Sequence, residues 1–327
     1  MKNKKIIALG FSISGKGHFI HREWFKAVDA LVVPYVPQTL LPFVKRFPLI
    51  GAVISLCHSF FLPKADVYIL DGIGAVTSVL FKRGIVIAIN SDPFFRNLPM
   101  MSFLKRKIVQ LFIKRIDGYI STSTMMYDLA QHYTKKPNKI VYPFIDVKKY
   151  SALKPNLQSI DVCSVGMGTA KGTNRVIEAF KLYKRKYPEA KLYVLGIWPK
   201  GDPQKMIIYK DVITPRFVDP ATYFEKCGLV VNGSFHESFG ANIIESMCAG
   251  IPPLVTEHCG AKEFIEDKYL ITTLDPKDIY KKMVVLHNNK KAYMLSKKYR
   301  KIGQQFTKQK SLRDFKKGIE MILKELS

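Results

Sequence analysis

Short runs of apolar, mostly β-branched residues alternate along the chain with longer stretches of helical periodicity. Nearly every position in these runs is apolar, which is typical of parallel strands that helices cover on both faces. Strands that alternate with helices in this way predict βαβ units and doubly wound sheets. The predicted strands are Ile6–Leu9, Asp66–Leu70, Ile85–Ile89, Gly118–Ser121, Asp161–Val165, Lys191–Leu195, Leu229–Val231 and Leu254–Thr256.

The stretch with the weakest pattern is Asp146–Gln158, so we predict an interdomain linker there. With 327 residues, the chain is long enough for two domains. We therefore expect an α/β protein with two Rossmann-like doubly wound domains and a cleft between them. The predicted parts are an N-terminal domain over 1–150, a C-terminal domain over 151–305, and a C-terminal helix over 306–327 that packs back on the N-terminal domain.

The charge of the chain points to an anionic partner. Its 52 Lys and Arg exceed its 26 Asp and Glu, which gives a formal net charge of +26. Nucleotide phosphates, nucleic acid and an acidic membrane surface all suit such a charge. The excess lies in both halves with no basic arm at either end, so we do not expect nucleic acid to be the partner.

Cysteines and apolar runs bear on the location of the protein. The five cysteines are scattered without a CxxC pair, which indicates a reducing compartment. The first apolar run, Ile6–Leu9, is too short for the core of a signal peptide. The most apolar stretch, Leu49–Leu62, is shorter than the ~20 residues of a bilayer helix. We therefore expect a cytoplasmic protein without a membrane span.

A glycine-rich loop follows the first predicted strand and includes Gly15, Gly17 and His18. Glycines at a strand-to-helix turn let backbone N–H groups approach a phosphate closely. With Lys16 the loop nearly matches a P-loop, and Asp71 could end a magnesium-binding strand. However, Gly17 stands where a P-loop needs a hydroxyl side chain. A P-loop-like NTPase is therefore retained as an alternative function.

Two further loops lie between a predicted strand and a helix. In the first, Lys171 comes just before the helix, where an ammonium and free amides can share a diphosphate. In the second, a helix of about three turns is predicted to start near Gly240, with Glu237 before it and Glu245 inside it. Unpaired N–H groups at that helix start favour an anion, and the two carboxylates suit sugar hydroxyls beside it.

Glu237 and Glu245 are separated by seven residues, and in this setting they resemble the EX7E signature of retaining family 4 glycosyltransferases (glycosyl transferases group 1). This family has the GT-B fold. The resemblance covers most of residues 160–290, while the N-terminal half matches only in outline. Its other parts follow in the expected order: Lys171-Gly172, Tyr187-Pro188, Gly196, Arg216-Phe217-Val218 and Gly260-Ala261-Lys262-Glu263.

The resemblance implies a hexosyltransferase-type enzyme that moves a sugar from a UDP- or GDP-linked donor to a glycan, lipid or protein. It implies that 1–150 is the acceptor side and that 151–305 binds the nucleotide sugar. The implied catalytic residue is Glu237. The implied donor-binding residues, to which we add His236, are Gly15, Gly17, Lys171, Arg216, Phe217, Val218, Phe239, Gly240, Ala241, Asn242 and Glu245.

The chain departs from the family pattern at two positions. Met167 stands where an arginine often precedes the lysine turn, and Asn90 stands where a histidine commonly follows the acceptor-domain strand. We expect Asp92 to take the catalytic role of that histidine. The departures also leave open a catalytically inactive GT-B protein that binds sugar nucleotides.

The resemblance implies a metal-independent, retaining reaction without a cofactor, with the nucleotide sugar as substrate. No two aspartates are separated by a single residue, so the chain has no DxD metal clamp. Lys171 and helix amides would then stabilise the leaving nucleoside diphosphate.

The segment between Asp92 and Asp117 combines six basic side chains with many apolar ones and contains no acid. A helix of this composition can lie in a membrane interface or receive a lipid-linked acceptor. A core helix with snorkelling lysines has the same pattern. We expect peripheral contact with an anionic membrane, which the apolar stretch Leu40–Leu62 could join.

Overall fold

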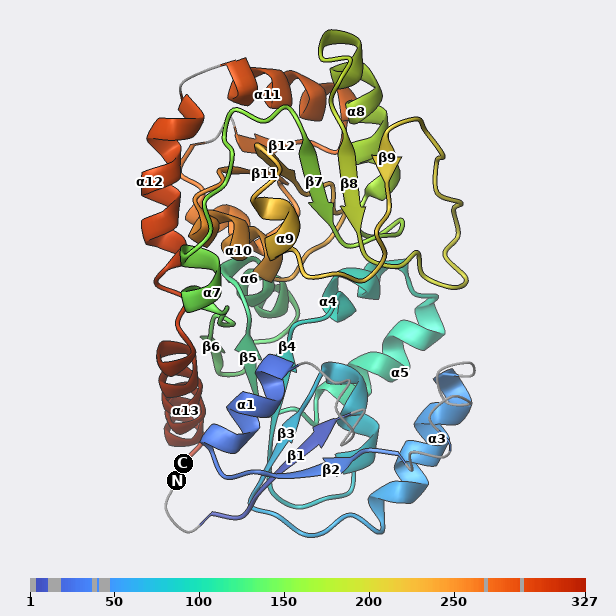
Figure 1. Cartoon of the computed structure of the whole chain (residues 1–327). Coiled ribbons are helices and arrows are strands. Elements are labelled where there is room, and N and C mark those ends of the chain that lie inside the picture. The colour runs from blue at the N-terminus through green and yellow to red at the C-terminus, as the bar shows by residue number, and fades with distance from the viewer. Residues whose placement is uncertain (1–3, 11–18, 37–39, 41–47, 268–269, 289–290) are drawn as a thin grey trace. The chain divides into compact units, whose positions relative to one another are not determined.

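The computed structural model describes the chain except for residues 1–3, 11–18, 37–39, 41–47, 268–269 and 289–290. The chain divides into two compact units: an N-terminal unit of residues 1–143 with 309–327, and a C-terminal unit of residues 144–308. Each unit contains a six-stranded parallel sheet with helices packed against it (Figure 1). The predicted α/β architecture of two doubly wound sheets is confirmed.

The sheet of the N-terminal unit has the strand order β2-β1-β3-β4-β5-β6. Its strands are β1 (Ile6–Gly10), β2 (Leu31–Pro34), β3 (Val67–Leu70), β4 (Ile85–Asn90), β5 (Gly118–Ser121) and β6 (Asn138–Ile140). Side chains of β1 alternate between two buried cores, with Ile7 and Leu9 in one and Ile6 and Ala8 in the other. Burial on both faces explains why this strand is entirely apolar.

Helices cover both faces of this sheet, as Figure 1 shows. One face packs against α1 (Phe19–Ala27) and α13 (Lys308–Glu325), through Trp24 and Phe315 among others. The other face packs against η2, α4 and α5. Phe95 lies in its core, and the partly buried Phe112 packs against that core. The other helices in the described part of this unit are α3 (Pro48–Ser59), η2 (Ile73–Val79), α4 (Phe94–Asn97), η3 (Leu98–Met100), α5 (Phe103–Ile113) and α6 (Thr124–Tyr133).

The sheet of the C-terminal unit has the strand order β12-β11-β10-β7-β8-β9. Its strands are β7 (Val162–Val165), β8 (Leu192–Leu195), β9 (Val212–Ile213), β10 (Leu229–Val231), β11 (Pro253–Thr256) and β12 (Ile271–Thr272). The other elements are α7 (Val147–Ser151), α8 (Thr173–Lys186), α9 (Ala221–Phe224), α10 (Ala241–Ala249), η4 (Gly260–Phe264), α11 (Pro276–Asn288) and α12 (Lys291–Gly303).

All eight predicted strands are present with bounds that agree within one residue, and four strands were not predicted. The missed strands are β2, β6, β9 and β12, the edges of the two sheets. The stretch 146–158, which we expected to be a linker, contains α7, and Tyr150 of that helix is buried in the C-terminal unit. No helix among the described residues is long and apolar enough to cross a membrane.

Candidate functional site

The sequence motifs of the C-terminal unit lie at the carboxyl ends of its strands. β7, β8 and β10 are parallel neighbours, and the loops that carry Lys171, Gly196 and Glu237 leave their carboxyl ends. In open α/β sheets, ligands bind outside the carboxyl ends of the strands. The fold therefore brings together motifs that are far apart in the sequence.

The loops after β7 and β10 pack directly on each other. Gly172 has a φ of +65° and caps α8, and a Cβ on this residue would lie 1.7 Å from the carbonyl oxygen of Gly233. The N–H of Phe235 donates to the carbonyl of Ala170 at 2.9 Å. Only glycine fits such a contact, and the contact fixes Lys171 beside the loop that carries Glu237.

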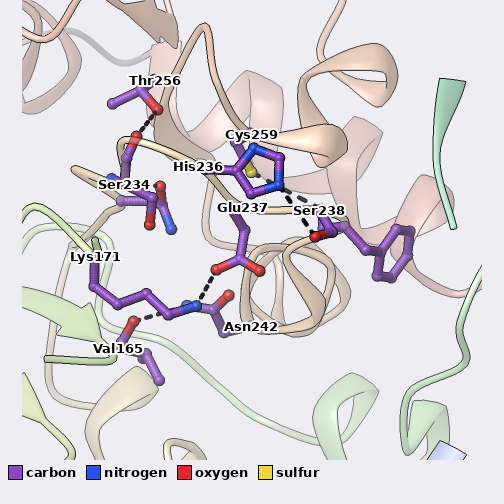
Figure 2. Close-up of polar contacts among 11 residues, drawn as sticks. Val165, Lys171, Ser234, His236, Glu237, Ser238, Asn242, Thr256 and Cys259 are labelled. Atoms are coloured by element: carbon purple, nitrogen blue, oxygen red, sulfur yellow. Dashed lines mark hydrogen bonds and ion pairs between the residues drawn. The ribbon is translucent and has the colours of Figure 1, made fainter. Parts of the chain in front are cut away.

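Lys171 and Glu237 form an ion pair, which Figure 2 shows between the ammonium and the carboxylate. The backbone of Glu237 is also fixed, because its N–H donates to His258 and its carbonyl accepts from Gly260. The Lys171 side chain is 38% exposed, so an anion from solvent can reach its ammonium. Lys171 and Glu237, for which the sequence predicted roles in donor binding and catalysis, are thus in direct contact.

The start of α10 adds backbone donors to this edge. Gly240 caps the helix with a φ of +88°, and the helix begins where the sequence predicted its start. The N–H groups of Ala241 and Asn242 belong to the first turn, where a helix has no internal acceptors. The Asn242 side chain donates to the carbonyl of Val165 at 3.2 Å and ties α10 to β7 (Figure 2).

Phe239 lies in the loop before α10, but its ring points into the core of the unit. Its side chain is buried and packs against Phe264 and Phe306. His236 is half-buried, and its Nε2 lies 3.4 Å from the hydroxyl oxygen of Ser238. Figure 2 shows His236 and Ser238 in the same loop as Glu237.

Glu245 lies inside α10 and contacts α7. Tyr150 of α7 donates a hydrogen bond to its carboxylate. Burial raises the pKa of Glu245 to about 7, while that hydrogen bond and nearby Lys149 oppose the rise. No sequence motif indicated Tyr150, because α7 falls in the stretch that we expected to be a linker.

The segment Arg216-Phe217-Val218 follows the carboxyl end of β9, which is an edge strand of the same sheet. Arg216 has a φ of +68°, and its carbonyl accepts the N–H of Gly196 at 2.7 Å, which joins the loops after β8 and β9. The Phe217 ring is exposed. Among the described residues, no hydrogen bond or ion pair links this segment to Lys171, Glu237 or Glu245.

In the N-terminal unit, Asp92 belongs to a group of titratable side chains at the carboxyl ends of β3 and β4. Burial raises the pKa of Asp92, and the charge of Asp71 adds to the rise, whereas the N–H groups of Phe94 and Ile73 lower it. His21 of α1 contacts Asp71 with 2.5 Å between Nδ1 and Oδ1. No sequence motif indicated His21, and Asp71 was expected only as a P-loop partner. Gly15, Gly17 and His18 lie outside the described residues.

Asn90, which replaces the family histidine, is fully buried. Its amide donates to the hydroxyl of Ser121 at 3.2 Å and to the carbonyl of Met126 at 2.7 Å. These bonds connect β4 to β5 and α6, so its side chain stabilises the sheet edge. Within the described part of the chain, no three His, Cys, Asp or Glu side chains are grouped to hold a metal ion.

Comparisons with known proteins agree with this architecture. Residues 148–308 match the family model described as glycosyl transferases group 1. An uncharacterized glycosyltransferase of Methanocaldococcus jannaschii is 30% identical over 114 residues, which are 34% of this chain and 32% of that protein. The alignment thus spans about a third of that relative.

Two solved structures have the same fold over nearly all of this chain. HepE of Anabaena, in complex with UDP-glucose, matches 97% of this chain and 100% of its own, with 15% identity and a TM-score of 0.77. Sucrose-phosphate synthase of Thermosynechococcus elongatus matches 98% of this chain and 100% of its own, with 15% identity and a TM-score of 0.71.

The two parallel sheets and these matches define a GT-B protein with a glycosyltransferase domain. The similarity to the group 1 glycosyl transferases extends over residues 148–308, which are just under half of the chain.

Proposed function

We propose that this protein is a retaining, metal-independent glycosyltransferase that uses a nucleotide-diphosphate sugar as donor. The observation that carries the proposal is the contact between Lys171 and Glu237 at the starts of α8 and α10. A cation and two helix N-termini suit a diphosphate, and a carboxylate beside them suits sugar hydroxyls or a developing positive charge.

In this proposal, the donor diphosphate takes the place of Glu237 as partner of the Lys171 ammonium. The carboxylate is then released toward the donor sugar, and Glu245 accepts hydrogen bonds from the ribose hydroxyls. Arg216, Phe217 and Val218 lie along the base. HepE is crystallised with UDP-glucose, and this supports a uridine nucleotide over a guanosine nucleotide as the donor.

A thermal-shift panel tests the donor site. UDP, GDP, ADP, ATP, UDP-glucose and GDP-mannose are compared in EDTA and in Mg²⁺. A ligand at about 100 times its Kd should add about 2.7 kcal/mol of stability. We expect one diphosphate to stabilise the protein equally in both buffers, and this shift to disappear in Lys171→Ala. A shift that needs ATP and Mg²⁺ and is lost in Lys16→Ala would support the NTPase alternative instead.

The reaction is tested by donor turnover with candidate acceptors and by the anomeric configuration of the product in proton NMR. Retention of the donor configuration is expected, and inversion would contradict the proposal. We expect Glu237→Gln to lower turnover by about 100-fold, because one electrostatic contact to the reacting sugar is lost. Donor binding without turnover on glycan, lipid or peptide acceptors would leave only a nucleotide-sugar-binding role.

We further propose that Asp92 acts on the acceptor side, with Asp71 and His21 as its neighbours. Two close carboxylates and an imidazole can accept hydrogen bonds from acceptor hydroxyls. Asp92→Asn is expected to raise the acceptor KM or lower kcat while the Kd of the donor stays the same. Asp128→Asn, on α6 of the same unit, serves as the control for a lost carboxylate.

We also propose that the N-terminal unit contacts anionic membranes through α5. Phe103, Leu104 and Leu111 of this helix are exposed, as are Lys105 and Lys107 between them. Apolar side chains flanked by cations suit the interface of an anionic bilayer. Flotation with phosphatidylglycerol vesicles tests this contact, and Leu104→Ser with Leu111→Ser should reduce binding. Met294→Ser, an exposed position of α12, should leave binding unchanged.

A further inference from the structure

A basic cavity opens at the amino ends of the central strands of the N-terminal unit. Its volume is about 690 Å³, and the chain segments that lead into β1, β3 and β4 line it. All strands of this sheet are parallel, so the cavity and the Asp71–Asp92 group lie at opposite edges of the sheet. The cavity is therefore separate from the proposed acceptor residues.

The walls of the cavity carry more positive than negative charge. Lys4, Lys64, Lys82 and Arg83 line it together with one acid, Asp66. The Asp66 carboxylate accepts the backbone N–H of Lys5 at 2.7 Å, and Lys82 donates to the carbonyl of Leu62 at 2.7 Å.

Three of the four cations of the cavity have no partner among the residues that the structure describes. The side chains of Lys4, Lys64 and Arg83 form no hydrogen bond or ion pair within the described part of the chain. Grouped cations without acids to neutralise them attract an anion of matching size. The three cations are thus available to bind an external anion.

Exposed phenylalanines lie in the same chain segments. Phe60 and Phe61 precede the Lys64 wall and are 72% and 84% exposed, while Phe81, in the Arg83 wall, is 69% exposed. The rings of Phe60 and Phe81 lie 6.4 Å apart, so the two segments present their aromatic side chains together. A group of exposed aromatic side chains beside cations is typical of a membrane-binding surface.

The cavity has a fixed frame that connects it to α5. The hydroxyl of Tyr68 accepts the N–H of Ala65 and donates to the carbonyl of Pro63. Arg115, just after α5, donates to the carbonyls of Lys82 and Gly84 at 2.7 Å each. The cavity walls thus meet the end of the helix whose exposed residues form the proposed membrane contact.

From these observations we infer that the cavity binds the headgroup of an anionic phospholipid while Phe60, Phe61 and Phe81 enter the bilayer interface. The inference deepens the proposed membrane contact and rests on it. One compact cavity suits a single headgroup, whereas single-stranded nucleic acid needs an elongated basic groove that follows its backbone.

The test measures the partition of the full chain onto phosphatidylcholine vesicles with and without phosphatidylglycerol. Each cation near an anionic surface strengthens binding about fivefold. We therefore expect Lys64→Ala with Arg83→Ala to weaken binding by more than about tenfold. The matched control is Lys277→Ala with Lys281→Ala, which removes the same charge from exposed positions of α11 and should cause at most a twofold change.

A second pair of variants tests the aromatic side chains. Phe60→Ser with Phe61→Ser should weaken binding to the anionic vesicles, whereas Tyr293→Ser with Met294→Ser, at exposed positions of α12, should not. Thermal unfolding of each variant, with and without the stabilising nucleotide, checks that folding and donor binding are unchanged. Because the nucleotide shift is read separately, loss of the donor site and loss of the headgroup site are distinguishable.

Three results would overturn the inference. If Lys64→Ala with Arg83→Ala weakened binding no more than the control Lys277→Ala with Lys281→Ala, net charge alone would drive binding. Equal binding to both vesicle types would remove the anionic headgroup as the ligand. Tighter binding of a single-stranded oligonucleotide that is lost in Lys64→Ala with Arg83→Ala would assign the cavity to nucleic acid.

Discussion

The positive charge of a lysine at a helix start is partly neutralised by a neighbouring glutamate as long as no anionic ligand is bound. Lys171 and Glu237 are both partly exposed, so water screens their attraction and the pair adds little to stability. In the proposed donor complex, the same ammonium would interact more strongly with a diphosphate, because that ligand has more charge and would also contact the amides of α10. The pair is therefore better suited to binding than to stabilisation of the fold.

This difference predicts the behaviour of Lys171→Ala. The Kd of the stabilising nucleoside diphosphate should rise about 10- to 100-fold, which is the range of a lost charged hydrogen bond. Calorimetric titration measures the change. Lys181→Ala is the control, because Lys181 lies on α8, the helix that follows Lys171, and also pairs with a glutamate, Glu178. An unchanged Kd in Lys171→Ala would remove this lysine from the donor site.

Glu245 predicts a pH dependence of stability. Its pKa rises from 4.5 to about 7 on folding, chiefly because the carboxyl is buried. Between these values the folded chain keeps a proton that the unfolded chain releases, so the free energy of unfolding falls as the pH rises. Glu245→Gln should therefore gain stability relative to the natural chain between pH 5 and pH 8, by an amount on the order of 2 kcal/mol.

Melting curves at the two pH values measure this gain. Glu178→Gln, at a more exposed carboxyl that pairs with Lys181, should show the same difference from the natural chain at both pH values. A constant difference for Glu245→Gln as well would mean that the carboxyl ionises normally in the folded protein.

At the scale of elements, the proposed donor site depends on two loops that are in contact through two glycines. The contact between Gly172 and Gly233 leaves no space for a side chain. The loops position the starts of α8 and α10, so a change in their packing affects stability and donor binding together.

Gly172→Ala tests this contact against a matched control. Gly201 also has a positive φ, of +82°, but no atom lies within 4 Å of the position where its Cβ would be. Gly201→Ala should cost about 1–2 kcal/mol from backbone strain alone. Gly172→Ala should cost clearly more in chemical denaturation and should also weaken nucleotide binding. Equal losses would show that the loops relax around the added methyl group.

The sequence predicted inner strands well and edge strands poorly for one physical reason. Inner strands such as β3 are buried on both faces and read as continuous apolar runs. Edge strands such as β2 and β9 are partly exposed, and β9 has only two residues, so their composition resembles that of loops. Tertiary pairing, rather than local pattern, makes them strands.

For the candidate site, the sequence indicated single residues but not their partners. The motif around Gly240 correctly predicted the start of α10, because a glycine cap is a local property. The pairing of Lys171 with Glu237 joins residues 66 positions apart, and His21 with Asp71 joins residues 50 apart. Such contacts follow from strand order, which a single sequence does not determine.

At the scale of the whole molecule, the N-terminal unit is completed by the last helix of the chain. α13 contributes Phe315, Ile319 and Ile322 to one core of that unit. The Phe315 ring stacks on Trp24 with 5.0 Å between centroids, and the Trp24 indole donates to Ser311 of the same helix at 2.8 Å. The first and last parts of the sequence therefore share one core.

Phe315→Ala should destabilise the N-terminal unit by about 3–5 kcal/mol, because a fully buried ring is lost. The chain has two tryptophans, so Trp24 fluorescence in a Trp198→Phe background follows this unit selectively. Met321→Ala, a partly exposed position of α13, should change stability by less than about 0.5 kcal/mol. Loss of the nucleotide-induced shift in Phe315→Ala would show instead that the two units unfold together.

The position of α13 has a consequence for synthesis on the ribosome. The residues of α1 and of the first sheet emerge early, but the helix that covers Trp24 emerges only after residues 144–308 have been translated. At about 5–20 residues per second, this interval lasts roughly 8–33 s. During that time, one apolar face of the nascent sheet lacks its native cover, so chaperones that bind exposed apolar segments should associate with the first half of the newly made chain.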